Sequence, residues 1–328
     1  MNPKTEIVGV ARGFYALPIL MTLARRGVVD RLLGDGVTLG ELGGHRDNLR
    51  SVMTYLANLG WVVDDAGRYR ATELGTKVLR RCGAYGILYS YRSYIANLEQ
   101  ILFDPEAKVH VHRDENVVGS GTAHIRKYFS RVKKAIVETE AKYILDVGCG
   151  DGTFLNYCAR QRSELRLVGV DTSEVALAVT RRNLRSKATL LQGSVSEPEI
   201  IVQKLESRGI SPAELMVSIW FVFHEVLGIE GVDLTRMLEG YRKLAPNHGM
   251  IIGEIFDVPS AVLAAHHDET AVPEFNLFHE LSGQKLFTLD AWRESIAAAG
   301  FDVEQFIGFD ELPGEERTYY GSAIWCLR

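Results

Sequence analysis

Residues 144–153 read ILDVGCGDGT, an apolar strand that ends in Asp146 and then turns through three glycines, Gly148, Gly150 and Gly152. Glycine has no Cβ, so a turn with glycine at alternate positions adopts backbone angles denied to other residues and lets a ligand approach closely. The following stretch, FLNYCA, is amphipathic and predicts a helix. The pattern indicates a strand, turn and helix built around a flat, polar ligand.

The next apolar strand, LRLVGVD, ends in Asp171. A carboxylate at the tip of the second strand of a βαβ unit is placed to accept hydrogen bonds from both hydroxyls of a ribose. The nicotinamide dinucleotide fingerprint spaces its glycines as G-x-G-x-x-G, whereas here they run G-x-G-x-G. The spacing therefore favours a different nucleoside ligand.

DVGCGDG followed by GVD resembles the first motif and the acidic strand end of class I S-adenosylmethionine-dependent methyltransferases. The resemblance implies that Asp146 and the glycine turn face the methionine part of the cofactor and that Asp171 holds its ribose. It also implies that Trp220 contributes to the cofactor site.

The third element of this resemblance is LLQGSV, residues 190–195. This chain has Gly193 and Ser194 where the family often has Gly-Asp near the adenine. The adenine contact is therefore open between Ser194 and Gln192, with Gly193 as part of the site.

Composition fits a soluble enzyme. The 328 residues are 46% hydrophobic, which suffices for a large core and suggests about two domains, and the net charge of −5 gives no general attraction to nucleic acid. The cysteines show no metal-ligand spacing and indicate reduced thiols. No segment reaches the ~20 apolar residues of a membrane span. We expect a cytoplasmic protein without nucleic-acid or membrane partners.

Periodicity predicts a winged-helix-like unit over residues 1–84. Apolar residues recur at helical spacing over 14–33 and 48–59, and WVVDDAGRYRAT then predicts a hairpin with its turn at 65–67. Such a unit serves either DNA binding or dimerisation. Because the second helix has few basic residues and much apolar surface, dimerisation is favoured and a homodimer is expected.

The remainder predicts a helical connector over 85–140, contributing to the substrate pocket, and an α/β domain over 141–328. Strands alternate there with helices, which is typical of a Rossmann-like parallel sheet covered on both faces. The last two strands are consistent with the antiparallel tail of class I methyltransferases.

The whole arrangement resembles the small-molecule O-methyltransferase superfamily. After the fourth strand the sequence reads SIWFVFHEVLG, where that family has an apolar strand followed by His-Asp. The resemblance implies that His224 takes the position of the general base that deprotonates a phenol, with Glu225 as the matching carboxylate.

A second histidine, His279, lies in PEFNLFHELSGQ, where O-methyltransferases usually present apolar side chains to the acceptor. Paired imidazoles are a poor wall for a phenol and a good half of a metal site. His224, Glu225 and His279 together resemble the branch that methylates the β-carbon of 2-oxo acids with a metal held by two histidines. We expect one metal ion, iron or zinc, with Glu225 as a third ligand or as the partner that orients His224. The alternative for His279 is a core histidine with one hydrogen bond.

A metal has a clear use in this reaction. The enolate of a 2-oxo acid can attack the sulfonium methyl group only if the charge on its oxygen is stabilised, and a chelated metal does this as a Lewis acid. The resemblance therefore implies C-methylation through a metal-stabilised enolate, in the biosynthesis of non-proteinogenic amino acids, antibiotics or other natural products. Arg113 is the leading candidate to bind the substrate carboxylate through its guanidinium fork, with Arg92 and Arg126 as competitors.

The substrate is open among 5-guanidino-2-oxopentanoate (2-ketoarginine), phenylpyruvate and branched aliphatic 2-oxo acids. Acidic residues near His279 favour the guanidino compound: Asp268, Glu269, Glu274 and Glu280. Two other functions compete. One is O-methylation of a phenol with His224 as a metal-free base, and the other is a winged-helix DNA-binding regulator that binds the cofactor.

Overall fold

The structure is a computed structural model that describes residues 3–109, 128–184, 187–265, 272–312 and 318–328. The chain divides into two compact units, residues 1–96 with 110–123 and residues 97–109 with 124–328. Each unit is described by itself.

The first unit combines short helices with a three-stranded antiparallel sheet of order β1-β3-β2. Its elements are α1 (Pro3–Arg25), α2 (Val28–Leu33), β1 (Val37–Thr38), α3 (Leu39–Leu42), α4 (Arg46–Asn58), β2 (Val62–Asp65), β3 (Arg68–Ala71), α5 (Glu73–Leu79), α6 (Cys82–Ser90) and α7 (Arg92–Ala96). The predicted winged-helix organisation is confirmed, including the hairpin, whose turn residues Ala66 and Gly67 both have positive φ.

The helix predicted over 14–33 is wrong in its bounds. It begins at Pro3 and breaks at Gly27, whose φ of 66° is left-handed, so that α2 starts afresh at Val28. The expectation that no segment has membrane-spanning apolarity also fails, because Lys4–Arg25 reaches a mean hydropathy of 1.7. Arg12 is the one charged residue between positions 7 and 24. One such helix is weak evidence for a membrane, since core helices have the same composition.

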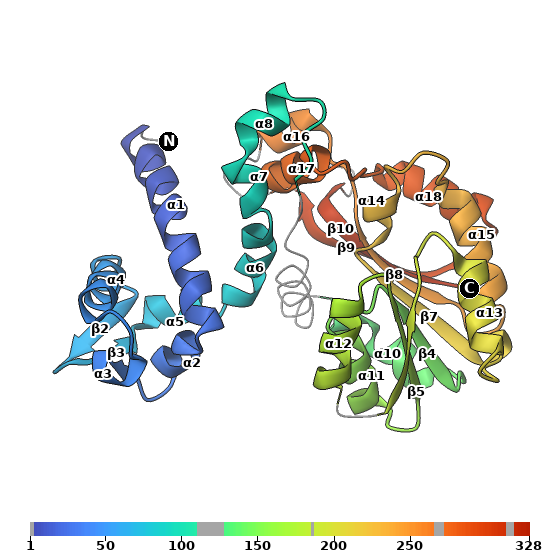
Figure 1. Cartoon of the computed structure of the whole chain (residues 1–328). Helices are drawn as coiled ribbons and strands as arrows, with labels where there is room; N and C mark the ends of the chain where they lie inside the picture. The colour runs from blue at the N-terminus through green and yellow to red at the C-terminus, as the bar shows by residue number, and fades with distance from the viewer. Residues whose placement is uncertain (1–2, 110–127, 185–186, 266–271, 313–317) are drawn as a thin grey trace. The chain divides into compact units, whose positions relative to one another are not determined.

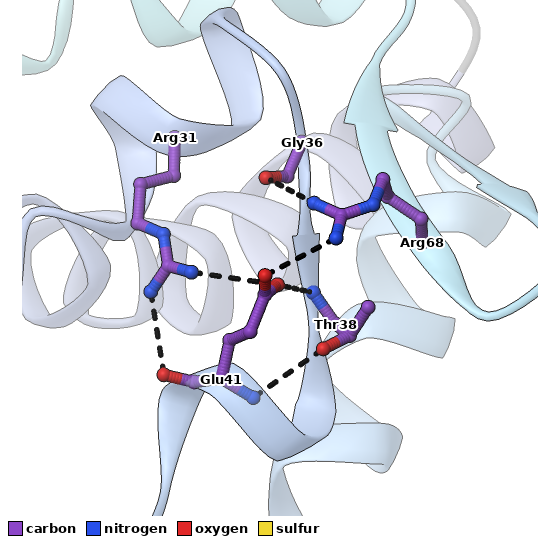
Figure 2. A network of polar contacts seen from close by, with 5 residues as sticks. All are labelled: Arg31, Gly36, Thr38, Glu41 and Arg68. Atoms are coloured by element: carbon purple, nitrogen blue, oxygen red, sulfur yellow. Dashed lines mark hydrogen bonds and ion pairs between the residues drawn. The ribbon is translucent and has the colours of Figure 1, made fainter.

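Glu41 ties the first unit together (Figure 2). Its carboxylate accepts a hydrogen bond from the Thr38 amide at 2.7 Å and pairs with Arg68 at 3.1 Å and Arg31 at 3.4 Å. Arg68 also donates to the carbonyl of Gly36 at 3.0 Å. The bonds from Thr38 and Arg68 lower the pKa of Glu41 to about 2. The network joins β1, β3, α2 and α3 in one place.

The second unit is built on a seven-stranded sheet of order β6-β5-β4-β7-β8-β10-β9 (Figure 1). The strands are β4 (Tyr143–Val147), β5 (Arg166–Asp171), β6 (Ala188–Gln192), β7 (Leu215–Trp220), β8 (Met250–Ile255), β9 (Val303–Leu312) and β10 (Thr318–Leu327). The first five are parallel, and β10 is antiparallel to both β8 and β9. The predicted Rossmann-like sheet with an antiparallel tail is confirmed.

Helices cover both faces of this sheet. The elements are α8 (Leu98–Phe103), η1 (Phe129–Val132), α10 (Lys133–Glu138), α11 (Thr153–Gln161), α12 (Glu174–Asn183), α13 (Pro198–Glu206), η2 (Pro212–Glu214), α14 (Phe223–Val226), α15 (Leu234–Leu244), α16 (Ser260–Ala265), α17 (Val272–Leu281) and α18 (Leu289–Ala298). One apolar core forms between the sheet and α13, α15 and α18, and another between the sheet and α10, α11 and α12. The carboxyl ends of the parallel strands are therefore the edge where a ligand can enter.

The network at Glu41 predicts a pH-dependent loss of stability in Glu41→Gln. The folded carboxyl stays ionised down to about pH 2, against an ordinary pKa of 4.5, so its contribution is present above about pH 4.5 and is lost as the pH falls toward 2. We expect a lower unfolding midpoint at pH 7, with the difference from wild type shrinking as the pH falls below 4.5. Glu73→Gln, which removes one exposed pair with Lys77, is the control. Equal midpoints for both variants would contradict the role of the network.

Candidate active site

The glycine turn after β4 packs closely against Val222, just beyond the end of β7. Gly148, Gly150 and Gly152 have φ values of 75°, 54° and 78°. The Gly148 amide donates to the carbonyl of Val170 at 2.8 Å, and a Cβ on Gly148 would lie 2.3 Å from Cγ2 of Val222. The chain therefore needs glycine here for two reasons, the left-handed backbone and the close approach.

Asp171 braces this turn from the neighbouring strand. One carboxylate oxygen accepts from the Gly150 amide at 3.0 Å and the other accepts from the Ser173 amide at 2.9 Å. The carboxylate thus fixes the turn and lies at the tip of β5, the position from which ribose hydroxyls are bound in such folds.

Asp146 lies beneath the turn and is buried, with a hydrogen bond from the Ser218 hydroxyl at 2.8 Å. Burial, with smaller contributions from the charges of Asp171 and Asp151, raises the pKa of Asp146 to about 8, although the hydrogen bond from Ser218 opposes the rise. The raised pKa favours the neutral form of Asp146, so this side chain supports the turn through its hydrogen bond with Ser218 and not through its charge.

The other predicted cofactor residues lie in different settings. The Gly193 amide donates to the Asp171 carbonyl at 3.1 Å, and the Ser194 hydroxyl pairs with that of Ser196 at 2.7 Å. The exposed Gln192 donates its amide to the Thr172 carbonyl. The ring of Trp220 is buried among Phe129 and Phe154, 4.9 Å and 5.0 Å away between centroids, so it is part of the core aromatic cluster.

His224 lies on α14, directly beyond β7, and is buried. Its Nδ1 is 2.7 Å from Oε1 of Glu254, a fully buried residue of β8. Glu254 also accepts hydrogen bonds from the amides of Phe223 at 2.9 Å and Ile255 at 2.8 Å. Because a carboxylate only accepts, the proton of the imidazole is held on Nδ1 and the lone pair lies on Nε2.

Glu254 was missed by the sequence analysis. It is the single acid in the apolar strand GMIIGEIF, and that isolation was the available signal. The role considered for Glu225, orienting His224 through Nδ1, belongs in the structure to Glu254. Glu225 itself is part-exposed on α14.

His279, on α17, faces His224. The centroids of the two rings are 4.9 Å apart and their planes cross at 67°. The Nδ1 atom of His279 lies 2.6 Å from the carbonyl of Phe275, which fixes the proton on Nδ1. Burial, and secondly the proximity of His224, lower the pKa of His279 to about 3, so this imidazole is neutral near pH 7.

Backbone contacts hold the two histidine segments together. The amide of Lys285 donates to the His224 carbonyl at 3.1 Å, and the amide of Gln284 donates to the His279 carbonyl at 2.9 Å. A Cβ on Gly228 would lie 2.2 Å from the carbonyl oxygen of Gly283. The spacing of the imidazole pair is therefore set by main chain.

The structure describes only some of the other predicted site residues. Arg113 and Arg126 lie outside the described residues, and Arg92, in the first unit, donates to the carbonyl of Tyr89 at 3.0 Å. Glu274 and Glu280 are exposed on α17, while Asp268 and Glu269 are outside the described ranges. Within the described part of the chain, no three or more His, Cys, Asp or Glu side chains gather as a metal site.

The chain resembles known methyltransferases along nearly its whole length. Residues 12–105 match the AprA winged helix domain and residues 108–226 match the AprA MT2-like domain. A 2-ketoarginine methyltransferase from Streptomyces arginensis is 26% identical over 318 residues, which cover 91% of this chain and 88% of that protein.

Solved structures give the same fold. Human N-acetylserotonin methyltransferase in complex with S-adenosylmethionine aligns with a TM-score of 0.66 at 13% identity, covering 99% of this chain and 98% of that chain. An O-methyltransferase family protein from Burkholderia thailandensis aligns with a TM-score of 0.63 at 14% identity, covering 99% and 98%. At these identities the likeness concerns the fold.

The close approach at Gly148 predicts a selective effect of Gly148→Ala. Its new methyl group must displace Val222, so we expect the affinity for S-adenosylmethionine to fall by about tenfold or more. Gly209→Ala is the matched control, because Gly209 has a similar φ of 70° but no atom within 4 Å of its Cβ position. Calorimetric titration measures both variants. Equal affinities would show that the turn does not hold the cofactor.

Proposed function

Because the chain belongs to the class I S-adenosylmethionine-dependent methyltransferases, we propose that it methylates the β-carbon of a 2-oxo acid. The observation that carries this proposal is the pair of buried imidazoles, His224 just beyond β7 and His279 on α17, whose ring centroids are 4.9 Å apart. An acceptor site for a phenol needs one base, whereas this site has a second neutral imidazole facing the first.

The two imidazoles have the chemistry that protein ligands of a metal ion require. Each Nδ1 is committed to a backbone or carboxylate oxygen, so each Nε2 carries the lone pair that a metal requires. His279 is neutral because of its lowered pKa, and a neutral imidazole is the ligating form. With two protein ligands from His224 and His279, positions remain for the ketone and carboxylate oxygens of a 2-oxo acid. Iron and zinc both suit such a site.

A metal ion held there supplies Lewis acidity toward the substrate oxygens, and S-adenosylmethionine supplies the electrophilic methyl group. The protein itself does three things. Glu254 keeps the His224 imidazole in one tautomer and one orientation. The burial of both rings limits access of water, and the Gly148 turn positions the donor beside the segment that leads to His224. Glu225, next to His224 on α14, does not gather with the two histidines as a three-residue metal site in the described chain, so the proposal uses the two imidazoles as the protein ligands.

The guanidino compound 5-guanidino-2-oxopentanoate is the leading substrate. The 2-ketoarginine methyltransferase relative supports it, since the alignment spans most of both chains. Glu274 and Glu280 are exposed, so these two residues do not support that substrate, and Asp268 and Glu269 lie outside the described residues. Phenylpyruvate and branched aliphatic 2-oxo acids share the chelating end. The product would serve the biosynthesis of a non-proteinogenic amino acid or an antibiotic.

O-methylation of a phenol is the second candidate. The His224 and Glu254 pair favours it, because a buried carboxylate on Nδ1 leaves Nε2 of the imidazole as a general base without any metal. The fold neighbours include an O-methyltransferase family protein. This function assigns no task to His279.

We also propose that the protein is a homodimer formed through its first unit. The side chains of Ile7, Val10 and Phe14 follow one side of α1 and are 70%, 74% and 69% exposed. A second copy of this helix would cover the same apolar stripe.

A panel of acceptors tests the proposed reaction. We expect purified protein with S-adenosylmethionine to transfer methyl to the β-carbon of 5-guanidino-2-oxopentanoate, detected by product mass and by the loss of one β-hydrogen. Phenylpyruvate, a branched aliphatic 2-oxo acid and simple phenols complete the panel. Methylation confined to phenols would select the second candidate instead.

Removal of either histidine tests the metal. We expect about one metal ion per chain in the wild type, and the loss of both metal and methylation in His224→Ala and His279→Ala. Glu254→Gln should weaken metal affinity or activity by about 10–100-fold. S-adenosylmethionine binding should survive in all three variants, and His248→Ala is the control. Full activity of metal-free wild type, with a mild His279→Ala phenotype, would contradict the metal site.

A further inference from the structure

Asn276 lies on α17 three residues before His279. Side chains three residues apart lie on the same face of a helix, so Asn276 and His279 share a face. Leu277, 51% exposed, and the exposed Glu274 mark the opposite face. Asn276 therefore extends the surface of α17 that carries the acceptor-site imidazole.

The carbonyl oxygen of the Asn276 side chain is buried and accepts no hydrogen bond. A buried polar atom of this kind is costly, and in folded proteins it usually has a partner from the chain, from water or from a ligand. Trp220 and Trp292 also bury an unpaired indole nitrogen, but their rings pack in aromatic cores, such as Trp292 against Trp325 at 5.4 Å. Asn276 differs because it lies on the same face of α17 as His279, in the proposed acceptor site.

We infer that Asn276 determines substrate specificity, by accepting a hydrogen bond from the guanidinium tail of a 2-oxo acid. The inference rests on the proposed function and assigns the recognition of the tail to this side chain. The chelating end of the substrate lies at His224 and His279, and the tail extends along α17 toward Asn276.

The guanidinium tail supplies the kind of group that the Oδ1 atom of Asn276 can bind. A guanidinium group has only N–H donors, and an amide oxygen only accepts. Three methylenes separate the guanidino group from the ketone of 5-guanidino-2-oxopentanoate, a span comparable with one helical turn of about 5.4 Å. The carboxylate of the same molecule balances the guanidinium charge, so a neutral acceptor suffices. A phenyl or alkyl tail would leave the oxygen of Asn276 buried and unpaired.

Two substrates of similar shape distinguish the effect of a hydrogen bond to Asn276 from the effect of shape complementarity. One is 5-guanidino-2-oxopentanoate, and the other is 7-methyl-2-oxooctanoate, which replaces the four heavy atoms of the guanidino group by an isobutyl group of similar size. They are compared with wild type, Asn276→Leu and Asn276→Asp. Leucine keeps the volume without an acceptor, and aspartate keeps the acceptor. The affinity for S-adenosylmethionine reports whether each variant retains its fold.

We expect Asn276→Leu to lower kcat/KM for the guanidino probe by about 10–100-fold, since its donors lose their acceptor, and to leave or raise kcat/KM for the alkyl probe. Asn276→Asp should keep the preference for the guanidino probe. An equal change for both probes in Asn276→Leu, with unchanged cofactor affinity, would overturn the role of Asn276.

Measuring the binding of the two probes tests the role of Asn276 independently of the proposed reaction. If wild type methylates neither probe, the proposed function fails, and calorimetry with S-adenosylhomocysteine bound still decides the role of Asn276. Selective binding of the guanidino probe that Asn276→Leu abolishes would support it. Equal binding of both probes to wild type would overturn it.

Discussion

Glu254 is fully buried at the end of β8, where its carboxylate accepts the amides of Phe223 and Ile255 and meets Nδ1 of His224 at 2.7 Å. These hydrogen bonds provide the buried carboxylate with partners, and they hold α14 against β8. The carbonyl of His224 in turn accepts from Lys285, beyond the end of α17. The orientation of His224 therefore depends on one buried carboxyl group, whereas His279 is oriented by the carbonyl of Phe275.

The proposed donor and acceptor sites adjoin in the short segment after β7. Val222 lies against the glycine turn, and His224 follows it by two residues. Phe221, between them and the sheet, has a φ of 55°, an unusual value for a side chain of this size. Strain of this kind persists where the surroundings determine the backbone, and it is common beside reaction sites.

Local patterns were sufficient for most of the fold. The glycine turn, the parallel strands and the hairpin of the first unit follow from residue spacing, because each depends on neighbours in sequence. The break at Gly27 and the strand β1 were missed, since a single glycine and a two-residue strand leave little periodic signal. Glu254 was missed for a different reason, because its meaning arises only when β8 lies beside α14. The same holds for Asn276, whose buried oxygen is a property of packing.

Enolisation is the step that separates the proposed chemistry from its rivals, and it can be measured without methyl transfer. Wild-type protein with bound S-adenosylhomocysteine is mixed with 5-guanidino-2-oxopentanoate in deuterated water, and the β-hydrogens are followed by NMR. We expect exchange well above the rate without protein, and its loss in His279→Ala. Exchange no faster than the background, with the 2-oxo acid shown to be bound, would contradict activation of the β-carbon at the His224 and His279 site.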